Sequence, residues 1–429
     1  MKDYYDFEEY ERYYRSRKID KERVILHSDL NNFFASVETL FSEELKNVPL
    51  AVCGDKEKRH GIVLAKNEEA KKYGIKTGET ISSAMKKCPF LVIRPTHYSE
   101  YIVQSKKVID IYLSYATRVE PFGIDEAWID VTELAKRKKK CDVFQAGFSI
   151  AEEIRKRVKD ETGLTVSIGV SFNKSFSKLA SDFKKPDAVS VVSYDNFKGI
   201  VDGLPVENLL FVGRQTKEVF RRMKIETIGD LAKNKRITLK NALGKSGEKL
   251  WDTANGYDFS EVEFYHRKYD NKSVSKSTTT PYDIKNTEEA NAVIYSLCEA
   301  ISSELRKRKL FSSTVKLFVK YADFSSLVRQ EKLTLPTSKT QDIYEVTSSL
   351  YKRNVDLSFP VRAIGVGAEE LSKNKAEQMT LFFDKNSIDK TLDFTKEKYG
   401  KDIVKRASVI KNNRLCDFET ERIAFNSGL

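Results

Sequence analysis

The sequence has no C-x-x-C pair and no apolar run of about 18 consecutive residues, the length needed to cross a bilayer. We therefore expect no transmembrane helix, and the charged, tyrosine-rich start of the chain does not resemble a signal peptide. The five cysteines are scattered: Cys53, Cys88, Cys141, Cys298 and Cys416. This spacing fits neither a disulfide framework nor a zinc site, so we expect reduced thiols in a soluble, cytoplasmic protein.

An excess of basic residues is the main signal in the composition. Lysine and arginine number 75 and aspartate and glutamate 63, which gives a formal charge of +12 and a pI near 9.1. This balance favours a polyanionic partner, most simply nucleic acid. A chain of 429 residues is long enough for roughly two to four domains, each with its own core.

One stretch near the start combines a buried strand with a candidate metal ligand. Val24 to Leu26 are consecutive aliphatic residues, a pattern typical of a strand covered on both faces. Apolar residues then recur at helical spacing after Asn32, so Asp29 lies near a strand-to-helix junction. A carboxylate there is well placed to hold a hard cation such as Mg²⁺, and a turn or helix-capping role is the alternative.

A second acidic segment lies far downstream. Asp125 and Glu126 are adjacent acids inside an apolar, strand-like run. Neighbouring strand side chains point to opposite faces, so both acids reach one ligand only where the strand bends, which Gly123 permits. Paired carboxylates in a half-buried strand repel each other unless a cation neutralises them. Together with Asp29 they suit a two-metal site for phosphoryl transfer.

These segments resemble the Y-family DNA polymerases, the translesion enzymes that include bacterial DNA polymerase IV and the UmuC subunit of polymerase V. The resemblance rests on Leu26-His-Ser-Asp-Leu-Asn-Asn-Phe-Phe-Ala-Ser-Val-Glu38 together with Gly123-Ile-Asp-Glu-Ala127, and it extends from about Arg23 to the end of the chain. It implies an α+β, multidomain right-hand polymerase with a ferredoxin-like palm, small fingers, a helix-hairpin-helix thumb and a little-finger domain. The implied division is an N-terminal extension (1–22), palm (23–45 and 95–187), fingers (46–94), thumb (188–258), linker (259–277), little finger (278–370) and tail (371–429).

The resemblance also implies the catalytic site. Asp29, Asp125 and Glu126 are expected to hold two Mg²⁺ ions, with the backbone carbonyl of Leu30 as a further ligand. The implied reaction is template-directed attack of a primer 3′-hydroxyl on a deoxynucleoside triphosphate, with release of pyrophosphate. The enzyme is expected to have low fidelity, to lack proofreading and to act in the bypass of damaged DNA.

Two aromatic and two basic side chains are implied to contact the incoming nucleotide. Phe34 matches the family's steric gate, whose ring lies under the deoxyribose and leaves no space for a 2′-hydroxyl, and Phe33 precedes it. Lys71 and Lys185 match the basic residues that meet the triphosphate. On the residues alone, Phe34 also fits a core position, Lys71 a solvated helix and Lys185 the end of a helix.

Some positions depart from the family pattern. Glu68 stands where polymerase IV usually has a tyrosine, and a carboxylate cannot make that tyrosine's phosphate contact, so this segment is closer to UmuC. Ile62 and Leu64 are bulkier over the new base pair than the smallest side chains found there, which argues against bypass of large adducts. In the thumb, Phe211 replaces the first of two turn glycines and only Gly213 remains, which weakens the predicted phosphate contact.

The distal part of the chain is predicted to contact DNA and a sliding clamp. Between His266 and Arg353, 16 basic residues stand against 10 acidic ones, a net charge of +6, and basic residues alternate along a predicted strand. This pattern is explained if one face of the sheet contacts the DNA backbone. The alternative is a face exposed only to solvent. Residues 378–383 resemble the clamp peptide Gln-x-x-Leu-Phe; the matching positions are Gln378, Leu381 and Phe382.

Two other functions account for part of the sequence. A DNA- and clamp-binding scaffold on an inactive polymerase fold is disfavoured because Asp29, Asp125 and Glu126 are all present. A nucleotide cyclase can share a ferredoxin-like palm, but it leaves the thumb hairpins, the basic distal domain and the clamp peptide unexplained. The predicted partners are therefore primer-template DNA, deoxynucleoside triphosphates and a sliding clamp, with no membrane association.

Overall fold

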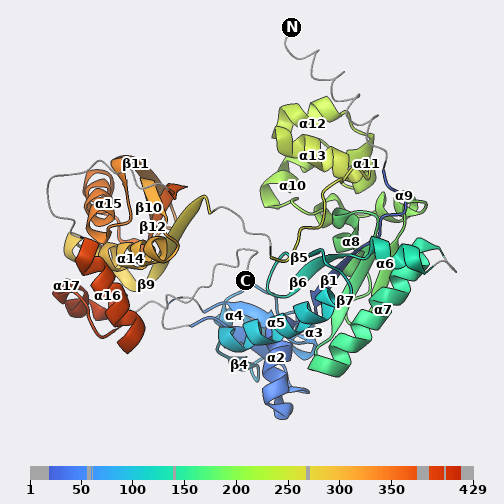
Figure 1. Cartoon of the computed structure of the whole chain (residues 1–429), viewed down its shortest axis with the longest axis horizontal. Coiled ribbons are helices and arrows are strands. Elements are labelled where there is room, and N and C mark those ends of the chain that lie inside the picture. Colours follow the sequence, from blue (N-terminus) through green and yellow to red (C-terminus); the bar gives the residue numbers. More distant parts are fainter. Residues whose placement is uncertain are drawn as a thin grey trace, which may run out of the picture. The chain divides into compact units, whose positions relative to one another are not determined.

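A computed structural model describes residues 19–55, 59, 61–138, 142–266, 271–373, 386–400 and 402–416 (Figure 1). The chain divides into two compact units. The first contains Met1–Cys53, Val63–Lys268 and Phe425–Leu429, and the second contains Gly54–Ile62 and Tyr269–Ala424. Most of the predicted N-terminal extension, residues 1–18, lies outside the described residues.

A five-stranded sheet of order β5-β6-β1-β7-β8 forms the centre of the first unit. Its strands are β1 (Ile25–Leu30), β5 (Val119–Pro121), β6 (Glu126–Asp130), β7 (Val166–Ser171) and β8 (Val189–Val192). β1 pairs antiparallel with both β6 and β7, and β8 is added parallel to β7. Without β8, this is the strand order and direction of the ferredoxin-like palm that the sequence predicts.

Alternation along β1 assigns its side chains to the two faces of this sheet. Val24, Leu26 and Ser28 face α5 (Tyr98–Leu113) and α7 (Val143–Thr162); the Ser28 hydroxyl, for example, lies 2.7 Å from that of Tyr112. Ile25, His27 and Asp29 point to the opposite face, against which α8 (Lys174–Ser181) packs. A short helix, α6 (Thr132–Arg137), follows β6.

The fingers region is inserted between the first two helical segments of the palm. The palm helix α2 (Phe33–Phe41) and the short η1 (Glu43–Leu45) precede it. The fingers contain a sheet of order β3-β2-β4, formed by β2 (Leu50–Cys53), β3 (Val63–Lys66) and β4 (Val92–Arg94), with the helices α3 (Glu68–Lys72) and α4 (Ile81–Lys87). Asn67 is the N-cap of α3: its side-chain oxygen accepts hydrogen bonds from the backbone N–H of Ala70 at 2.9 Å and of Leu50 at 3.0 Å. One amide side chain thereby caps the helix and fixes it to strand β2.

The thumb region consists of short helices: α9 (Phe197–Val201), η2 (Val206–Asn208), α10 (Arg214–Arg222), α11 (Ile228–Lys233), α12 (Arg236–Leu243) and α13 (Lys245–Ala254). In the turn before α10, Phe211 has a φ of 72°, so it adopts the left-handed conformation that glycine usually supplies. Its ring is 64 % exposed, and the Lys249 ammonium lies 5.3 Å from the ring centroid. Gly213 occupies the N-cap of α10.

The segment after the thumb is attached to the palm rather than free. Val262 is fully buried against Ile25 and Trp128. Glu120 on β5 accepts a hydrogen bond from the backbone N–H of Glu263 at 2.9 Å, and its carboxylate is also held by Lys174. At the other end of the predicted linker (259–277), strand β9 begins at Ser273. The linker prediction therefore included a packed segment and the start of a strand.

In the second unit, a four-stranded antiparallel sheet of order β11-β10-β12-β9 is covered by two helices on one face. Its elements are β9 (Ser273–Ile284), α14 (Thr287–Lys307), β10 (Phe311–Tyr321), β11 (Ser326–Thr337), α15 (Thr340–Asn354) and β12 (Val361–Ser372). Buried Val315 and Leu317 alternate with Lys316 and Lys320, which point to the face opposite the helices. Gly367 pairs with Lys316, so this open face combines basic and very small residues.

Residues 386–416 pack onto the same unit instead of extending from it. They form α16 (Asn386–Tyr399), α17 (Ala407–Lys411) and α18 (Asn413–Cys416). Arg306 on α14 donates to both carboxylate oxygens of Asp393, at 2.6 and 2.9 Å, and to Asp389 at 3.2 Å. Leu415 is buried in the core of the unit. The clamp-peptide residues Gln378, Leu381 and Phe382 lie outside the described residues.

The sequence predicted that the chain has no transmembrane helix and that its cysteines are reduced. No helix in the described ranges is long and apolar enough to span a membrane. Cys53, Cys88, Cys298 and Cys416 are free thiols, and Cys141 lies outside the described part of the chain.

Candidate active site

The three acids predicted from the sequence meet where β1 ends and β6 begins. Asp29 lies directly opposite Glu126 in the β1–β6 ladder, and the backbone N–H of Leu30 donates to the carbonyl oxygen of Asp125 at 2.8 Å. Asp125 occupies a bend just before β6, so the strand bends as the sequence analysis requires. A Cβ on Gly123 would lie 3.1 Å from a carboxylate oxygen of Asp125, so glycine leaves the space that this carboxylate needs.

Helix α8 and the turn after it bring two lysines to these acids. The Lys178 ammonium contacts the Glu126 carboxylate, and the Lys185 ammonium lies 2.9 Å from an oxygen of Asp29. Lys185 also pairs with Asp182 at 2.7 Å. In this arrangement the lysines supply the positive charge that balances the clustered carboxylates.

His27 lies beneath the acids on the same face of the sheet. It is fully buried, with Nε2 3.2 Å from an oxygen of Glu126 and Nδ1 3.0 Å from the Ser181 hydroxyl. Ser181 donates its own proton to the carbonyl oxygen of Lys178 at 2.7 Å. The imidazole therefore lies between the Glu126 carboxylate and the end of α8.

Burial and charge shift the pKa values of this cluster in opposite directions. Burial, together with repulsion from Asp29 and Glu126, raises the pKa of Asp125 to about 6. Burial alone would also raise the pKa of Glu126, but its contacts with His27 and Lys178 hold that pKa at about 2. Burial lowers the pKa of His27. Asp125 is thus the acid whose charge is least well compensated by the protein.

The donor set fits a hard divalent cation. Carboxylate oxygens with a neighbouring backbone carbonyl are the ligands that Mg²⁺ prefers. Among the described residues, no three His, Cys, Asp or Glu side chains already surround one point as a completed metal site. Asp29 and Glu126 are paired with lysines instead, and Asp125 carries a raised pKa because like charges crowd it. A divalent cation would relieve this crowding, so the residues present suit the predicted ion.

Phe33 and Phe34, which follow Asp29, differ in burial. Phe33 is buried, while Phe34 is half-buried and stacks on Tyr101, with ring centroids 4.3 Å apart and an interplanar angle of 11°. Tyr101 is itself fixed by donating from its hydroxyl to Glu38 at 2.6 Å. Phe33 is therefore a core residue, whereas Phe34 packs against that core and stays partly exposed.

Lys71 forms an ion pair with Glu68, which the sequence analysis did not predict. Its ammonium donates to Glu68 Oε1 at 2.6 Å. The same oxygen accepts a hydrogen bond from the side-chain amide of Asn32 at 2.8 Å. The fingers helix α3 is thus connected through Glu68 to the palm segment that carries Asp29 and Phe34.

The sequence analysis missed the roles of His27, Lys178 and Ser181. His27 precedes Asp29 by two residues, and the period of two in a strand places both on one face. Lys178 follows Lys174 by one helical turn, so the two share a face of α8. These spacings indicate shared faces, but only the packing of α8 on the sheet identifies their partners.

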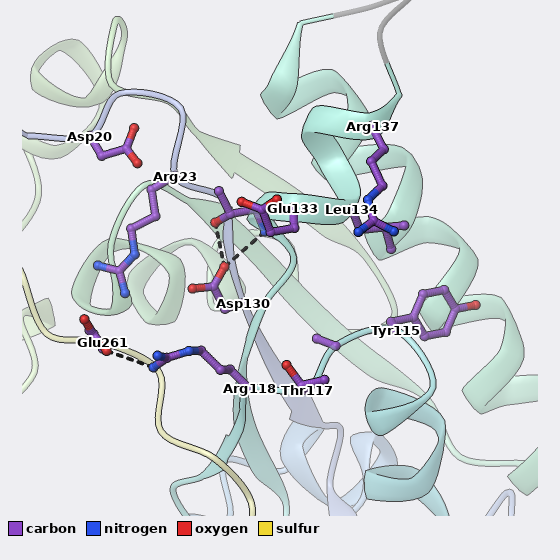
Figure 2. A pocket seen from close by; sticks show the side chains of 12 residues that line it. Asp20, Arg23, Tyr115, Thr117, Arg118, Asp130, Glu133, Leu134, Arg137 and Glu261 are labelled. Atoms are coloured by element: carbon purple, nitrogen blue, oxygen red, sulfur yellow. Dashed lines mark hydrogen bonds and ion pairs between the residues drawn. The ribbon is translucent and has the colours of Figure 1, made fainter.

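A cavity of about 620 Å³ lies away from the acids. It is at the Asp130 end of β6, opposite the Glu126 end, and Figure 2 shows Arg23, Arg118 and Glu261 among the side chains around it. Arg118 pairs with Glu261 at 2.8 Å. None of the predicted site residues lines this cavity, so it is not part of the candidate active site.

Comparison with known proteins identifies the family. Residues 28–182 match the impB/mucB/samB family and residues 271–381 match the C-terminal domain of that family. The DNA polymerase IV of Acetivibrio thermocellus is 44 % identical over 400 residues, which cover 92 % of this chain and 99 % of the relative. The chain belongs to the Y-family DNA polymerases. The DNA polymerase IV of Bacillus velezensis is 32 % identical over 413 residues, covering 95 % of this chain and 97 % of the relative.

A solved structure supports the same fold. A chimeric Y-family DNA polymerase superposes with a TM-score of 0.71 at 23 % sequence identity, over 82 % of this chain and 100 % of the other. The α+β, multidomain right-hand architecture predicted from the sequence is thereby confirmed. The Glu68 segment, which resembles UmuC, occurs in a Y-family polymerase that is similar to polymerase IV over nearly its full length.

Proposed function

We propose that this Y-family polymerase extends a primer 3′-end on a DNA template, taking deoxynucleotides from their triphosphates and releasing pyrophosphate. The observation that carries the proposal is the meeting of Asp29, Asp125 and Glu126 at one end of the β1–β6 pair, with lysines balancing their charge. Like-charged groups crowded in this way are costly unless a cation joins them.

In the proposed mechanism, Asp29, Asp125, Glu126 and the Leu30 carbonyl would hold two Mg²⁺ ions. The ions would supply electrostatic stabilisation to the attacking and leaving oxygens of the displacement. Glu126 is kept ionised by His27 and Lys178, and so remains available as a ligand. Burial and the neighbouring carboxylates raise the pKa of Asp125 to about 6, and a bound cation would favour the ionised form of this acid.

The remaining site residues act on the nucleotide. Lys185 pairs with Asp29 and is proposed to neutralise the triphosphate from the palm side. Lys71 is proposed to neutralise the triphosphate from the fingers side. The ring of Phe34, supported by Tyr101, is proposed to stand under the sugar, where a 2′-hydroxyl would collide with it.

DNA binding is proposed to use surfaces outside the site. The open face of the β11-β10-β12-β9 sheet carries Lys316 and Lys320 and contains Gly367, so it combines positive charge with space for close approach of a phosphate backbone. In the thumb, α10 begins at Arg214 behind the turn that Phe211 and Gly213 form. Phosphate contacts of this kind position DNA without reading its sequence.

Fidelity, lesion bypass and clamp binding complete the proposed function. Low fidelity and action in damage bypass follow from membership of the translesion family, and a sliding clamp is proposed to bind Gln378, Leu381 and Phe382. Synthesis without proofreading is likewise proposed.

Primer extension with purified protein, Mg²⁺ and the deoxynucleoside triphosphates tests the proposed function. We expect extension on an undamaged template and past a small lesion, and none by Asp125→Asn. DNA binding without any extension by the wild-type protein would instead indicate an inactive scaffold. Cyclic nucleotide formation from a triphosphate without DNA would indicate a cyclase.

A further inference from the structure

Glu68 occupies an unusual position for a carboxylate in a nucleotide site. Its Oε1 accepts hydrogen bonds from the Lys71 ammonium at 2.6 Å and from the Asn32 side-chain amide at 2.8 Å. Asn32 immediately precedes the aromatic pair and is held in the left-handed conformation, with φ 51°. One acidic oxygen therefore connects the first turn of α3 to the palm segment between Asp29 and Phe34.

The charges around Glu68 show that it is bound loosely. Its side chain is 47 % exposed and that of Lys71 is 42 % exposed, so their ion pair is weak and easily exchanged. Burial would raise the pKa of Glu68, but its hydrogen bonds with Lys71 and Asn32 lower it, so the residue is negatively charged at neutral pH. Lys66 is a further nearby cation, and its pKa is lowered by burial and by repulsion from Lys71.

We propose that Glu68 sets the affinity of the site for the incoming nucleotide by competing with the triphosphate for Lys71. This inference rests on the proposed polymerase function. A triphosphate carries more negative charge than one carboxylate, so Lys71 exchanges its partner when the nucleotide enters. Glu68 then remains beside the phosphates as an uncompensated like charge, which raises the nucleotide concentration needed for half-maximal rate.

The same helix contains a matched control. Glu69 and Lys72 form an equivalent pair one residue along, with Nζ–O distances of 2.6 and 2.8 Å. Successive helical residues are about 100° apart around the axis, so this pair does not share the direction of Glu68 and Lys71. Glu68→Gln and Glu69→Gln each remove one negative charge from α3, and only the first removes the charge bonded to Asn32 and Lys71.

Steady-state extension by one nucleotide on primer-template DNA tests this proposal. We expect Glu68→Gln to lower the nucleotide KM roughly three- to tenfold and to change kcat less than about twofold. The reason is that the substitution removes the same like-charge repulsion from the bound nucleotide and from the transition state. Glu69→Gln should leave both constants at wild-type values. Because the effect is electrostatic, the gap between Glu68→Gln and wild type should shrink as salt is raised.

The hydrogen bond to Asn32 is tested separately. Glu68→Gln keeps a side-chain oxygen for the Asn32 amide, whereas Asn32→Ala removes the donor and leaves the charge. We expect Asn32→Ala not to lower the nucleotide KM. An unchanged or raised KM in Glu68→Gln, or equal decreases in Glu68→Gln and Glu69→Gln, would overturn the proposal. Absence of extension by the wild-type protein would instead contradict the proposed function itself.

Discussion

Gly169 on β7 lies directly beneath Ser177 of α8: a Cβ atom on this glycine would stand 1.9 Å from the Ser177 carbonyl oxygen. The helix backbone therefore rests on the strand itself. This close approach brings Lys178 and Ser181 to the sheet, where they meet Glu126 and His27. A residue with no side chain thus fixes the distance between the acids and the cations that balance them.

We expect Gly169→Ala to weaken both fold and activity. A methyl group there must displace backbone, and overpacking of this kind costs about 3 kcal/mol. Because α8 carries Lys178, extension should fall by more than the loss of folded protein explains. Thermal unfolding and extension measured side by side test this expectation. Gly199→Ala, where an added Cβ meets no atom within 4 Å, is the control and should lower neither stability nor extension.

Asp125→Asn should abolish extension and leave primer-template affinity close to wild type. The proposed metal site loses one carboxylate, and metal ions supply several kcal/mol of transition-state stabilisation, so we expect a loss of about a thousandfold or more. Glu133→Gln, at the cavity beyond the other end of β6, is the control and should extend normally. Extension by Asp125→Asn at the wild-type rate would contradict the role of this acid.

The same substitution should stabilise the metal-free protein at neutral pH. Folding raises the pKa of Asp125 from 3.8 to about 6. Below about pH 4 the carboxyl is protonated in the folded and the unfolded protein, so it does not destabilise the fold. As the pH rises through 6 the folded protein must carry this buried charge, and the free energy of unfolding falls. Removing this charge should gain on the order of 2 kcal/mol at neutral pH and little near pH 4. Melting temperatures in a chelating buffer at the two pH values measure the difference. Equal gains at both would exclude the titration of Asp125 as the cause.

Phe34→Ala should increase ribonucleotide insertion relative to deoxyribonucleotide insertion. The substitution removes a half-buried ring stacked on Tyr101 and opens the space proposed to lie under the sugar. Phe41→Ala, at the exposed end of the same helix, should leave the ratio unchanged. If the ratio stays at its wild-type value in folded Phe34→Ala, the ring serves the core rather than sugar selection.

The double substitution Leu381→Ala and Phe382→Ala should remove clamp-stimulated synthesis and leave distributive synthesis intact. Two large apolar side chains contribute a few kcal/mol when buried in a partner, at about 25 cal/mol per Å². Met379→Ala, at a variable position of the Gln-x-x-Leu-Phe pattern, is the control. A double variant that melts earlier yet still responds fully to the clamp would show that the residues pack within the polymerase.

The local sequence pattern was sufficient to predict the strands and helices of the palm, because the strands are apolar and the helices begin and end at typical capping residues. In α7, for example, Asp142 caps the start by accepting from the backbone N–H of Phe144 at 2.8 Å, and Gly163 ends the helix with φ 72°. The convergence of Asp29 with Glu126 was predicted from the chemistry of the carboxylates and from the family resemblance. The antiparallel register of β1 and β6 is its physical cause.

Other features depend on long-range contacts that local pattern does not contain. Strand β11 (Ser326–Thr337) is mostly exposed, and its apolar residues Val328 and Leu335 are among the exposed ones, so apolar positions there do not identify the face that packs on the core. Val262 stands in a polar stretch, and its burial depends on Ile25 and Trp128, which come from the palm. The pairing of Glu68 with both Lys71 and Asn32 joins two regions whose spacing in the sequence gives no sign of contact.

The docking of α16 onto α14 through Arg306, Asp389 and Asp393 has a mechanical consequence for the proposed clamp peptide. Strand β12 ends at Ser372 and α16 begins at Asn386, and both elements belong to the second unit. The residues that flank the proposed clamp peptide on both sides are therefore held by the same unit. We expect a sliding clamp bound to this peptide to move together with the second unit.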